Sequence, residues 1–483
     1  MSTGRVSCRG VQHHLMNRLV ESTYYRAPVF LQNLLVSAYG LKLYRQRYGA
    51  RAGVYLHELL ASERLPPADM REFQRQRFVA MARHAIRTTP FYRDWARVRG
   101  FRPEDVTSLD HLREFPVLEK QAIQEAPEQF ISDHLPRSRL IEIGTSGTTG
   151  SPLRIFTDRN SRTHHYAFWS RLRGWYGLGP RSSRATLFGR VIMPASSDRP
   201  PFWRYDAAQR NLLLSSYHLA PANLPAYYRK LTSFQPSEIV GYPSSIYRIA
   251  MHILENDLPR LAPRVVITTA ETLLDYQREA ISKAFDAPLC DQYGCAEMAF
   301  FASQCPNGAM HFHPEHSVNE VVVPGGDGNP AGADESGELL ATGLVNWAMP
   351  LIRYRVGDSL SVTADICDCG RPFPVISSLQ GRLDDVVVSP RTGRPVGRLG
   401  PVFRADKAVR EAQVYQDAFG RIEIRIIPMS CFSAEHEQRI VKDVMRRVGG
   451  DVDIKVRLVD EIPRSANGKF RAVISDYRID GEH

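Results

Sequence analysis

The sequence lacks several features that would place it in other classes of protein. It has no apolar run of eighteen or more residues, so we expect no transmembrane helix. Its first residues, MSTGRVSCRGVQHHLMNRL, have no continuous apolar core, so a secretory signal is not expected either. Internal repeats and low-complexity tracts are also missing. With 43% hydrophobic and 24% charged residues over 483 positions, we expect a cytoplasmic globular protein of two or more domains.

Acidic residues are scarce near the N-terminus. Residues 1–50 contain Glu21 against seven arginines and lysines, and the whole chain carries a net charge of +10. Two interpretations stay open for this segment: a solvated helical face, or a surface that lies on anionic lipid or on a partner complex. No stacking pattern of basic and aromatic residues accompanies the charge, so nucleic acid is not the expected partner.

Cysteine is scarce as well, and its odd count of seven argues against a disulfide framework. Two short-spaced pairs stand out, Cys305 with His311 and Cys367 with Cys369, each beside a glycine-bearing turn. Three thiolates and one imidazole form a tetrahedral zinc set, and four protein ligands would make the zinc structural. Free thiols are the alternative, and His313 competes with His311 as the nitrogen ligand.

The order of apolar patterns predicts an α/β protein. Residues 1–60 are predicted to be helical, and a second helix begins near residue 70 and is ended or interrupted by Pro90. From about residue 138, short β-like runs alternate with helical ones, which favours layers of largely parallel sheet. After Glu315, glycine-rich turns join strands that look antiparallel, and the last hundred residues can form a small α+β domain.

A loop rich in hydroxyl groups follows the run RLIEI. It reads Thr145-Ser146-Gly147-Thr148-Thr149-Gly150, and a plain turn needs fewer such residues. Hydroxyl and backbone donors in this number suit a polyphosphate, but no lysine follows Gly150 as a Walker loop requires. The loop TSGTTGSP resembles instead the phosphate loop of the adenylate-forming enzymes, which include acyl-CoA synthetases.

Four further motifs resemble that superfamily, in its order along the chain. DQYGCAEMAF resembles the Y-G-x-x-E motif, which implies Tyr293 on adenine and Glu297 on Mg²⁺. PLIRYRVGDSL resembles Y-x-x-G-D, which implies Asp358 on the ribose. LQGRLDDVVV resembles the G-R-x-D hinge, with Arg382 near ribose or phosphate and Asp384 as the pivot between domains. IPRSANGKFR resembles the C-terminal motif whose lysine, here Lys469, enters the active site.

The closer resemblance is to the phenylacetate–CoA ligase branch and its CapK-like proteins from polysaccharide gene clusters. It lies in the segment SSYHLAPANLPAYYRKLTSFQPSEIVGYPSSIYRIA and in the N-terminal YYRAPVFLQNLLVSAYG. The branch's spacing favours His311 over His313 as a zinc ligand. It also places His218 and Tyr242 in the substrate pocket, although a structural role is open for both.

The resemblance implies a complete set of site residues. The implied catalytic residues are Lys469, Glu297 and a threonine of the loop. This threonine is Thr148 or Thr149, and we choose Thr148. The implied nucleotide-binding residues are Thr145, Ser146, Gly147, Thr149, Gly150, Arg154, Ala270, Glu271, Tyr293, Gly294, Asp358 and Arg382.

The implied fold is a large adenylating domain of layered mixed sheets, residues 1–378, with a helical extension over about 1–120. A hinge at 379–385 would lead to a small mobile α+β lid at 386–483. The implied activity is ATP- and Mg²⁺-dependent adenylation of a carboxylic acid, then transfer to CoA or another acceptor. A place in capsule or exopolysaccharide synthesis would fit, with the basic N-terminus on a membrane or on that machinery.

One segment departs from the branch. After G-R-L-D-D the chain continues VVVSPRTGRPVGRLGPVF, without the G-x-x-x-x-P-x-x-I-E pattern of phenylacetate–CoA ligases. The acceptor can therefore be CoA, a sugar, an amine, a carrier protein or a glycan. The alternative function is a non-catalytic binding or assembly component of an envelope-polysaccharide complex, but a scaffold has no physical need for Lys469.

Overall fold

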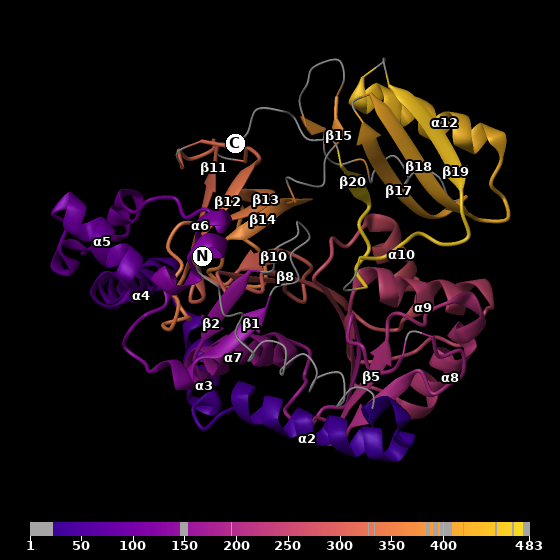
Figure 1. Ribbon diagram of the computed structural model, residues 1–483, viewed down its shortest axis with the longest axis horizontal. Helices are drawn as coiled ribbons and strands as arrows, with labels where there is room; N and C mark the ends of the chain where they lie inside the picture. Colours follow the sequence, from indigo (N-terminus) through magenta and orange to yellow (C-terminus); the bar gives the residue numbers. More distant parts are fainter. Residues whose placement is uncertain are drawn as a thin grey trace, which may run out of the picture.

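The computed structural model describes residues 23–144, 153–194, 196–326, 328–332, 334–382, 387–389, 395–396, 399, 408–418, 420–449, 452–465 and 468–476. A large domain is built around one mixed sheet, and a smaller domain at the C-terminal end has its own sheet (Figure 1). The predicted phosphate loop, Thr145 to Gly150, and the predicted pivot Asp384 lie outside the described residues.

The N-terminal part is helical, as predicted. It contains α2 (Val29–Arg47), α3 (Ala52–Ser62), α4 (Pro67–Thr88) and α5 (Pro90–Arg99). Pro90 is the first residue of α5, a position where the missing N–H costs nothing, and Thr89 before it is extended. Pro90 therefore separates two helices. Short 3₁₀ turns and α6 (Lys120–Glu125) lead to the hairpin of β1 (Ile141–Gly144) and β2 (Arg154–Thr157), which flanks the phosphate loop.

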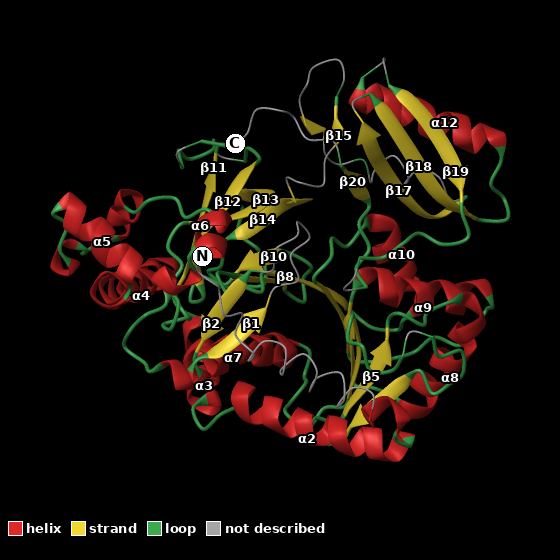
Figure 2. Ribbon diagram, in the orientation of Figure 1, coloured by secondary structure: helices red, strands yellow, loops and turns green. Residues whose placement is uncertain are grey.

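One half of the large sheet is mainly parallel. β5 (Asn211–Ser215), β3 (Arg184–Phe188), β6 (Glu238–Gly241), β7 (Val265–Thr269) and β8 (Leu289–Gly294) run side by side, and β4 (Trp203–Asp206) pairs antiparallel at the edge. The crossover helices are α8 (Leu224–Phe234), α9 (Pro243–Glu255) and α10 (Asp275–Ala284), and α7 (Arg159–Trp175) precedes β3 (Figure 2). All five residues of β7 are buried, which explains its continuous apolar pattern.

The other half of the sheet is antiparallel, as its sequence predicts. From β8 it continues through β9 (Phe301–Gln304), β10 (Met310–Phe312), β14 (Val375–Arg382), β13 (Tyr354–Thr363), β12 (Gly337–Gly343) and β11 (Ser317–Val322). Within the described residues this gives a twelve-stranded sheet. β14 runs to Arg382, so the predicted hinge begins inside this strand.

The C-terminal domain has the predicted α+β composition. Its sheet contains β17 (Val409–Ala418), β18 (Arg421–Pro428), β19 (Asp453–Leu458) and β20 (Val473–Ser475), and a short pair, β15 (Val387–Val388) and β16 (Pro395–Val396), precedes it. Ile422, Ile424 and Ile426 alternate on one face of β18 and join Val444 of α12 (Ala434–Val448) in one buried cluster. The predicted fold class is confirmed. No helix in the described part of the chain is long and apolar enough to cross a membrane.

Candidate active site

The carboxyl ends of the parallel strands lie at one edge of the sheet. In the strand register Leu187 lies opposite Gly241, Gly241 opposite Thr268, and Thr269 opposite Gln292. The residues that follow these strands are therefore neighbours, although they are far apart in the sequence. In open α/β sheets this edge is where ligands bind. Four predicted site residues lie there: Tyr242, Ala270, Glu271 and Tyr293.

Two predicted nucleotide residues contact each other directly. The Tyr293 hydroxyl donates a hydrogen bond of 2.6 Å to Oδ2 of Asp358, and the Tyr293 ring lies 4.6 Å from the Phe300 ring, centroid to centroid. Asp358 on β13 lies opposite Arg382 on β14 in the strand register. The fold thus brings three separate motifs to one place. A hydrogen bond this short restricts the orientation of both side chains.

Glu297 lies in the loop after β8. The hydroxyl of the buried Tyr354 donates to Oε1 of Glu297 at 3.3 Å, and the Glu297 side chain is half-buried. The contact links the Y-G-x-x-E motif to Tyr354, which lies four residues before Asp358. A carboxylate has acceptor capacity for several partners at once, which suits a hard cation such as Mg²⁺.

The segment 468–470 of the C-terminal domain contacts this edge of the sheet. The backbone N–H of Phe470 donates to Oε1 of Glu271 at 2.7 Å, and the N–H of Ser244 donates to Oε2 at 3.2 Å. Nζ of Lys469 lies 5.8 Å from the centre of the Tyr242 ring. Glu271 therefore joins the start of α9 to the segment that bears Lys469. Burial raises the pKa of Glu271, and its two backbone donors oppose that shift.

Ala270 has a backbone φ of +68°, the left-handed region that is uncommon for a residue with a Cβ. It lies between the end of β7 and Glu271, where the chain turns out of the sheet. Such conformations concentrate at functional sites because the surrounding structure must hold them. The predicted nucleotide contacts of Ala270 and Glu271 stay predictions, beside the domain contact that Glu271 makes here.

A second set of contacts joins the two domains farther along α9. Arg410 forms an ion pair with Glu255 at 2.8 Å and accepts through its carbonyl from the Tyr247 hydroxyl at 2.8 Å. Glu411 lies 3.5 Å from Arg248 of the large domain and 2.7 Å from Arg464 of its own domain. The C-terminal domain is thus held at two places on the large domain.

His218 has structural partners on both ring nitrogens. Nε2 donates to the Pro194 carbonyl at 3.1 Å, so Nδ1 accepts from the Ser215 hydroxyl at 2.7 Å. The buried ring stacks on Phe202, with 5.6 Å between centroids. This geometry favours the structural alternative for His218. Tyr242 is also buried, and its ring meets the edge of Phe188 on one side and Lys469 on another.

Arg154 is the first residue of β2 and lies at the end of the phosphate loop. Its Nε lies 2.8 Å from the Glu142 carboxylate across the hairpin, and both side chains are about half exposed. The guanidinium holds the pKa of Glu142 below its usual range. A pair this exposed is weak and can open for a phosphate.

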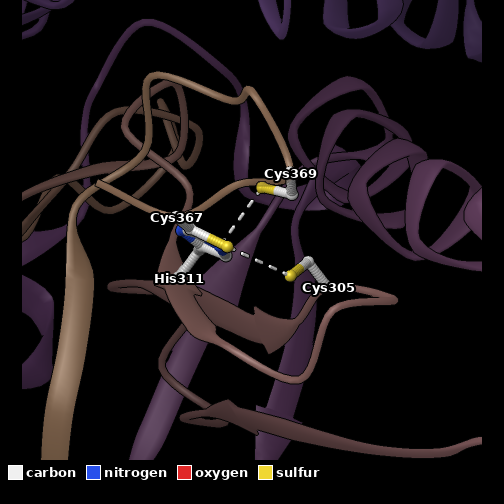
Figure 3. Close-up of side chains that lie close together, drawn as sticks. All are labelled: Cys305, His311, Cys367 and Cys369. Atoms are coloured by element: carbon white, nitrogen blue, oxygen red, sulfur yellow. Dashed lines mark hydrogen bonds between the residues drawn. The ribbon is translucent and has the colours of Figure 1, made fainter. Parts of the chain in front are cut away.

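The predicted metal ligands lie together. The ligand atoms of Cys305, His311, Cys367 and Cys369 all lie within 4.8 Å of one another, and Figure 3 shows the four side chains converging from three segments. The sulfurs of Cys305 and Cys367 are 3.8 Å apart, and Nε2 of His311 is 3.5 Å from the Cys369 sulfur. Nδ1 of His311 donates to the Phe373 carbonyl at 3.1 Å, which leaves Nε2 as the acceptor.

His313, the competing ligand, is used elsewhere. Its Nδ1 accepts from Arg171 at 2.7 Å, and its Nε2 lies 2.9 Å from the Ser303 hydroxyl. Arg171 is fully buried and also pairs with Glu315 at 2.6 Å. This buried network was not predicted. Neither was the role of Phe470 N–H on Glu271, because a contact across 199 positions leaves no local pattern.

Comparison with known proteins gives the families that this chain resembles. Residues 396–476 match the family described as the CapK C-terminal domain. Protein CapK of Staphylococcus aureus is 27% identical over 94% of this chain and 99% of its own. The phenylacetate-coenzyme A ligase of Thermus thermophilus is 23% identical over 85% of this chain and 98% of its own. The Escherichia coli enzyme of that name is 25% identical over 66% of this chain and 72% of its own.

Solved structures give the class of fold. The crystal structure of 2-hydroxyisobutyryl-CoA ligase in the postadenylation state has a TM-score of 0.67 at 20% identity, over 86% of this chain and 91% of its own. The fold is that of the adenylate-forming ligases. The similarity to CapK and to the phenylacetate-coenzyme A ligases supports the superfamily and the branch that the motifs predict. The relatives with an enzyme name are ligases, which supports the predicted class, an AMP-forming acid–thiol ligase.

The comparison also depends on how the domains are arranged. The open conformation of the same ligase, with 2-HIB-AMP and CoA, scores 0.53 over 86% of this chain and 93% of its own. Its thioesterification state also scores 0.53. The arrangement described here is thus nearer to the postadenylation state, where the score is 0.67.

Proposed function

We propose that this protein is an ATP-dependent ligase that adenylates a carboxylic acid and then passes the acyl group to CoA or another acceptor. The observation that carries the proposal is the position of Lys469. Its backbone is tied to Glu271 through Phe470, at the edge of the sheet that also bears Tyr242 and Tyr293. A lysine that a second domain holds at a ligand-binding edge is in a place to stabilise negative charge on a bound substrate.

Each of these site residues has its own role in the proposed adenylation. In this proposal Tyr293 and Asp358 hold the nucleoside, since their mutual hydrogen bond keeps both oriented. Lys469 places a point charge between the carboxylate and the α-phosphate, where charge develops, and preorganised charge of this kind contributes several kcal/mol. Mg²⁺ on Glu297 and Thr148 would neutralise the phosphates while the loop from Thr145 to Gly150 holds pyrophosphate. The catalysis is then mainly positioning.

Transfer of the acyl group would need a different arrangement of the domains. Structures of 2-hydroxyisobutyryl-CoA ligase in separate postadenylation and thioesterification states support such a movement. In this proposal the C-terminal domain leaves Glu271 after adenylation and turns about Asp384. CoA is the first acceptor to test, because the phenylacetate-coenzyme A ligases are relatives. We extend the proposal to capsule or exopolysaccharide synthesis on the ground of the name CapK alone, which one relative and the matching C-terminal family carry.

We also propose that the cluster of three cysteines and His311 holds a structural zinc ion. Zn–S bonds of about 2.3 Å and a Zn–N bond of about 2.0 Å give tetrahedron edges of about 3.8 Å between sulfurs and about 3.5 Å between sulfur and nitrogen. The observed 3.8 Å and 3.5 Å separations fit these edges. Four protein ligands leave no open position, so the zinc would tie together the turns after β9 and β13 and take no part in the chemistry.

The test is ATP–pyrophosphate exchange against a panel of aryl, short, long, hydroxy and amino acids. Exchange with one class of acid, abolished in Lys469→Ala, is expected. Lys469→Ala should keep the wild-type unfolding midpoint, since the side chain lies at a domain surface. If ATP binds and no acid supports exchange, the protein is better described as a non-catalytic component of an envelope-polysaccharide complex. If exchange survives in Lys469→Ala, the lysine has no role in adenylation.

A further inference from the structure

Helix α2 turns its polar side toward the protein. Gln32 accepts from the guanidinium of Arg204, and the Asn33 side chain accepts from the backbone N–H of Tyr205 at 3.0 Å. Ser37 accepts from the N–H of Ala207 at 2.9 Å. Gly40 is buried against Asp206, and a Cβ at this position would meet that carboxylate. These contacts fix α2 on β4 by hydrogen bonds, with the glycine providing the close approach.

The opposite side of α2 is apolar and exposed. Phe30 is 69% exposed and Leu34 is 65% exposed, and the same face also carries Leu31, Leu35, Ala38 and Leu41. These positions are three or four residues apart, so they form one stripe along the helix. Soluble surfaces rarely carry a contiguous apolar stripe of this length without a partner.

The apolar stripe of α2 ends at basic residues. Lys42 and Arg45 continue it on the last two turns of α2, and both line a cavity of about 680 Å³ beside the helix. Arg139 and Arg159 line the same cavity. Among the described lining residues Asp158 is the one carboxylate, and it caps the start of α7, where it accepts from Asn160 N–H at 2.7 Å and Ser161 N–H at 3.1 Å. The cavity is therefore electropositive, and Leu41 gives it an apolar wall.

We propose that the outer face of α2 docks this protein on a membrane surface that contains anionic phospholipid. An apolar stripe with cations at one end fits a helix that lies in the interfacial plane, with acyl chains under the leucines and headgroup phosphates against Lys42 and Arg45. The cavity gives one phosphate a place among four cationic side chains. Nothing in this inference depends on the proposed ligase activity.

The placement of α2 is compatible with a working lid. α2 runs along one edge of the molecule, and the C-terminal domain lies at the opposite edge (Figure 1). A membrane against the outer face of α2 would leave the C-terminal domain free to change its position. The surface would then bring the active site near acceptors that are themselves held in a membrane.

The test is flotation of the full-length protein with vesicles of phosphatidylcholine alone and with vesicles that also contain the anionic lipid phosphatidylglycerol. We expect binding to the anionic vesicles only. Leu34→Glu/Leu35→Glu should weaken it about a hundredfold, since two leucines leave the interface. Lys42→Glu/Arg45→Glu should weaken it at least about thirtyfold.

The matched control is Val98→Glu/Arg99→Glu on α5, which makes an apolar-to-acidic change and a charge reversal at two exposed residues away from α2. It should bind as the wild type does. Failure of the wild type to bind anionic vesicles would overturn the proposal, and so would unchanged binding by Leu34→Glu/Leu35→Glu. A wild-type dimer in sedimentation that Leu34→Glu/Leu35→Glu converts to a monomer, without any vesicle binding, would assign this face to a second copy of the chain instead.

Discussion

Replacing Glu271 should weaken the docking of the C-terminal domain on the large domain without unfolding the protein. The Glu271 carboxylate accepts from Phe470 N–H at 2.7 Å and from Ser244 N–H at 3.2 Å, and its side chain does not enter a strand or a hydrophobic cluster. Glu271→Ala removes both acceptors, whereas Glu271→Gln keeps an oxygen of the same reach and removes the charge.

The size of the effect follows from these contacts. A hydrogen bond to a charged acceptor contributes about 1.5–3 kcal/mol, which corresponds to about tenfold to a hundredfold in the population of the docked lid. Adenylation needs Lys469 in place, so ATP–pyrophosphate exchange should fall by that factor in Glu271→Ala and by less in Glu271→Gln. The Ser244 contact at the start of α9 contributes about 1 kcal/mol, so the large domain should lose little stability.

Two comparisons make the assay specific. Glu255→Gln breaks the pair with Arg410 in the same interface, where both side chains are about one-third exposed, and should change exchange by no more than about fivefold. Glu271→Ala combined with Lys469→Ala should lose no more than Lys469→Ala alone, because Glu271 acts through the lysine. Additive losses would refute the reasoning and assign Glu271 a role of its own, such as a nucleotide contact. Exchange within twofold of wild type in Glu271→Ala would refute it too.

Three further predictions concern the metal cluster, His218 and a buried acid. The purified protein should contain about one zinc per chain, measured by mass spectrometry of the metal. Cys367→Ser/Cys369→Ser should lose the zinc and lower the free energy of unfolding by about 3 kcal/mol or more. A metal-free wild type would contradict the zinc proposal. His218→Ala should lower the free energy of unfolding, measured in urea, by about 2 kcal/mol, because both ring nitrogens form hydrogen bonds within the fold. It should change the KM for the acid by less than threefold. A large change in KM with normal stability would assign His218 to the substrate pocket instead. Burial raises the pKa of Asp291 to about 6, although the Thr268 hydroxyl donates to it at 2.7 Å. Folding therefore favours the protonated acid, and stability should fall as the pH rises from about 4 through 6 and then stay level. Asp291→Asn should remove this dependence and gain about 2–3 kcal/mol at pH 7 relative to wild type, and equal pH profiles for the two proteins would disprove it.

Local sequence determined the kinds of elements and the motifs. Short β-like runs bounded by glycine, proline and serine, in alternation with helical runs, predicted the strands β3, β6, β7 and β8. Pro90 predicted the break between α4 and α5 because its ring cannot follow a helical turn. The order of the motifs predicted the superfamily, and the spacing of Cys367 and Cys369 predicted a ligand cluster. These signals need no knowledge of distant contacts.

The tertiary structure alone decided which residues meet. A side-chain hydrogen bond joins Tyr293 on β8 to Asp358 on β13, two strands that are not neighbours in the sheet, and the docking of the second domain places Phe470 on Glu271. The sequence separates these pairs by 65 and 199 positions. His311 and His313 are both chemically able to bind zinc, and Arg171 and Ser303 decide between them by occupying His313. The sequence pattern of α2 does not predict which side of the helix packs on the protein. Hydrogen bonds to β4 turn its polar side in, because a polar edge strand gives those groups partners that an apolar core cannot.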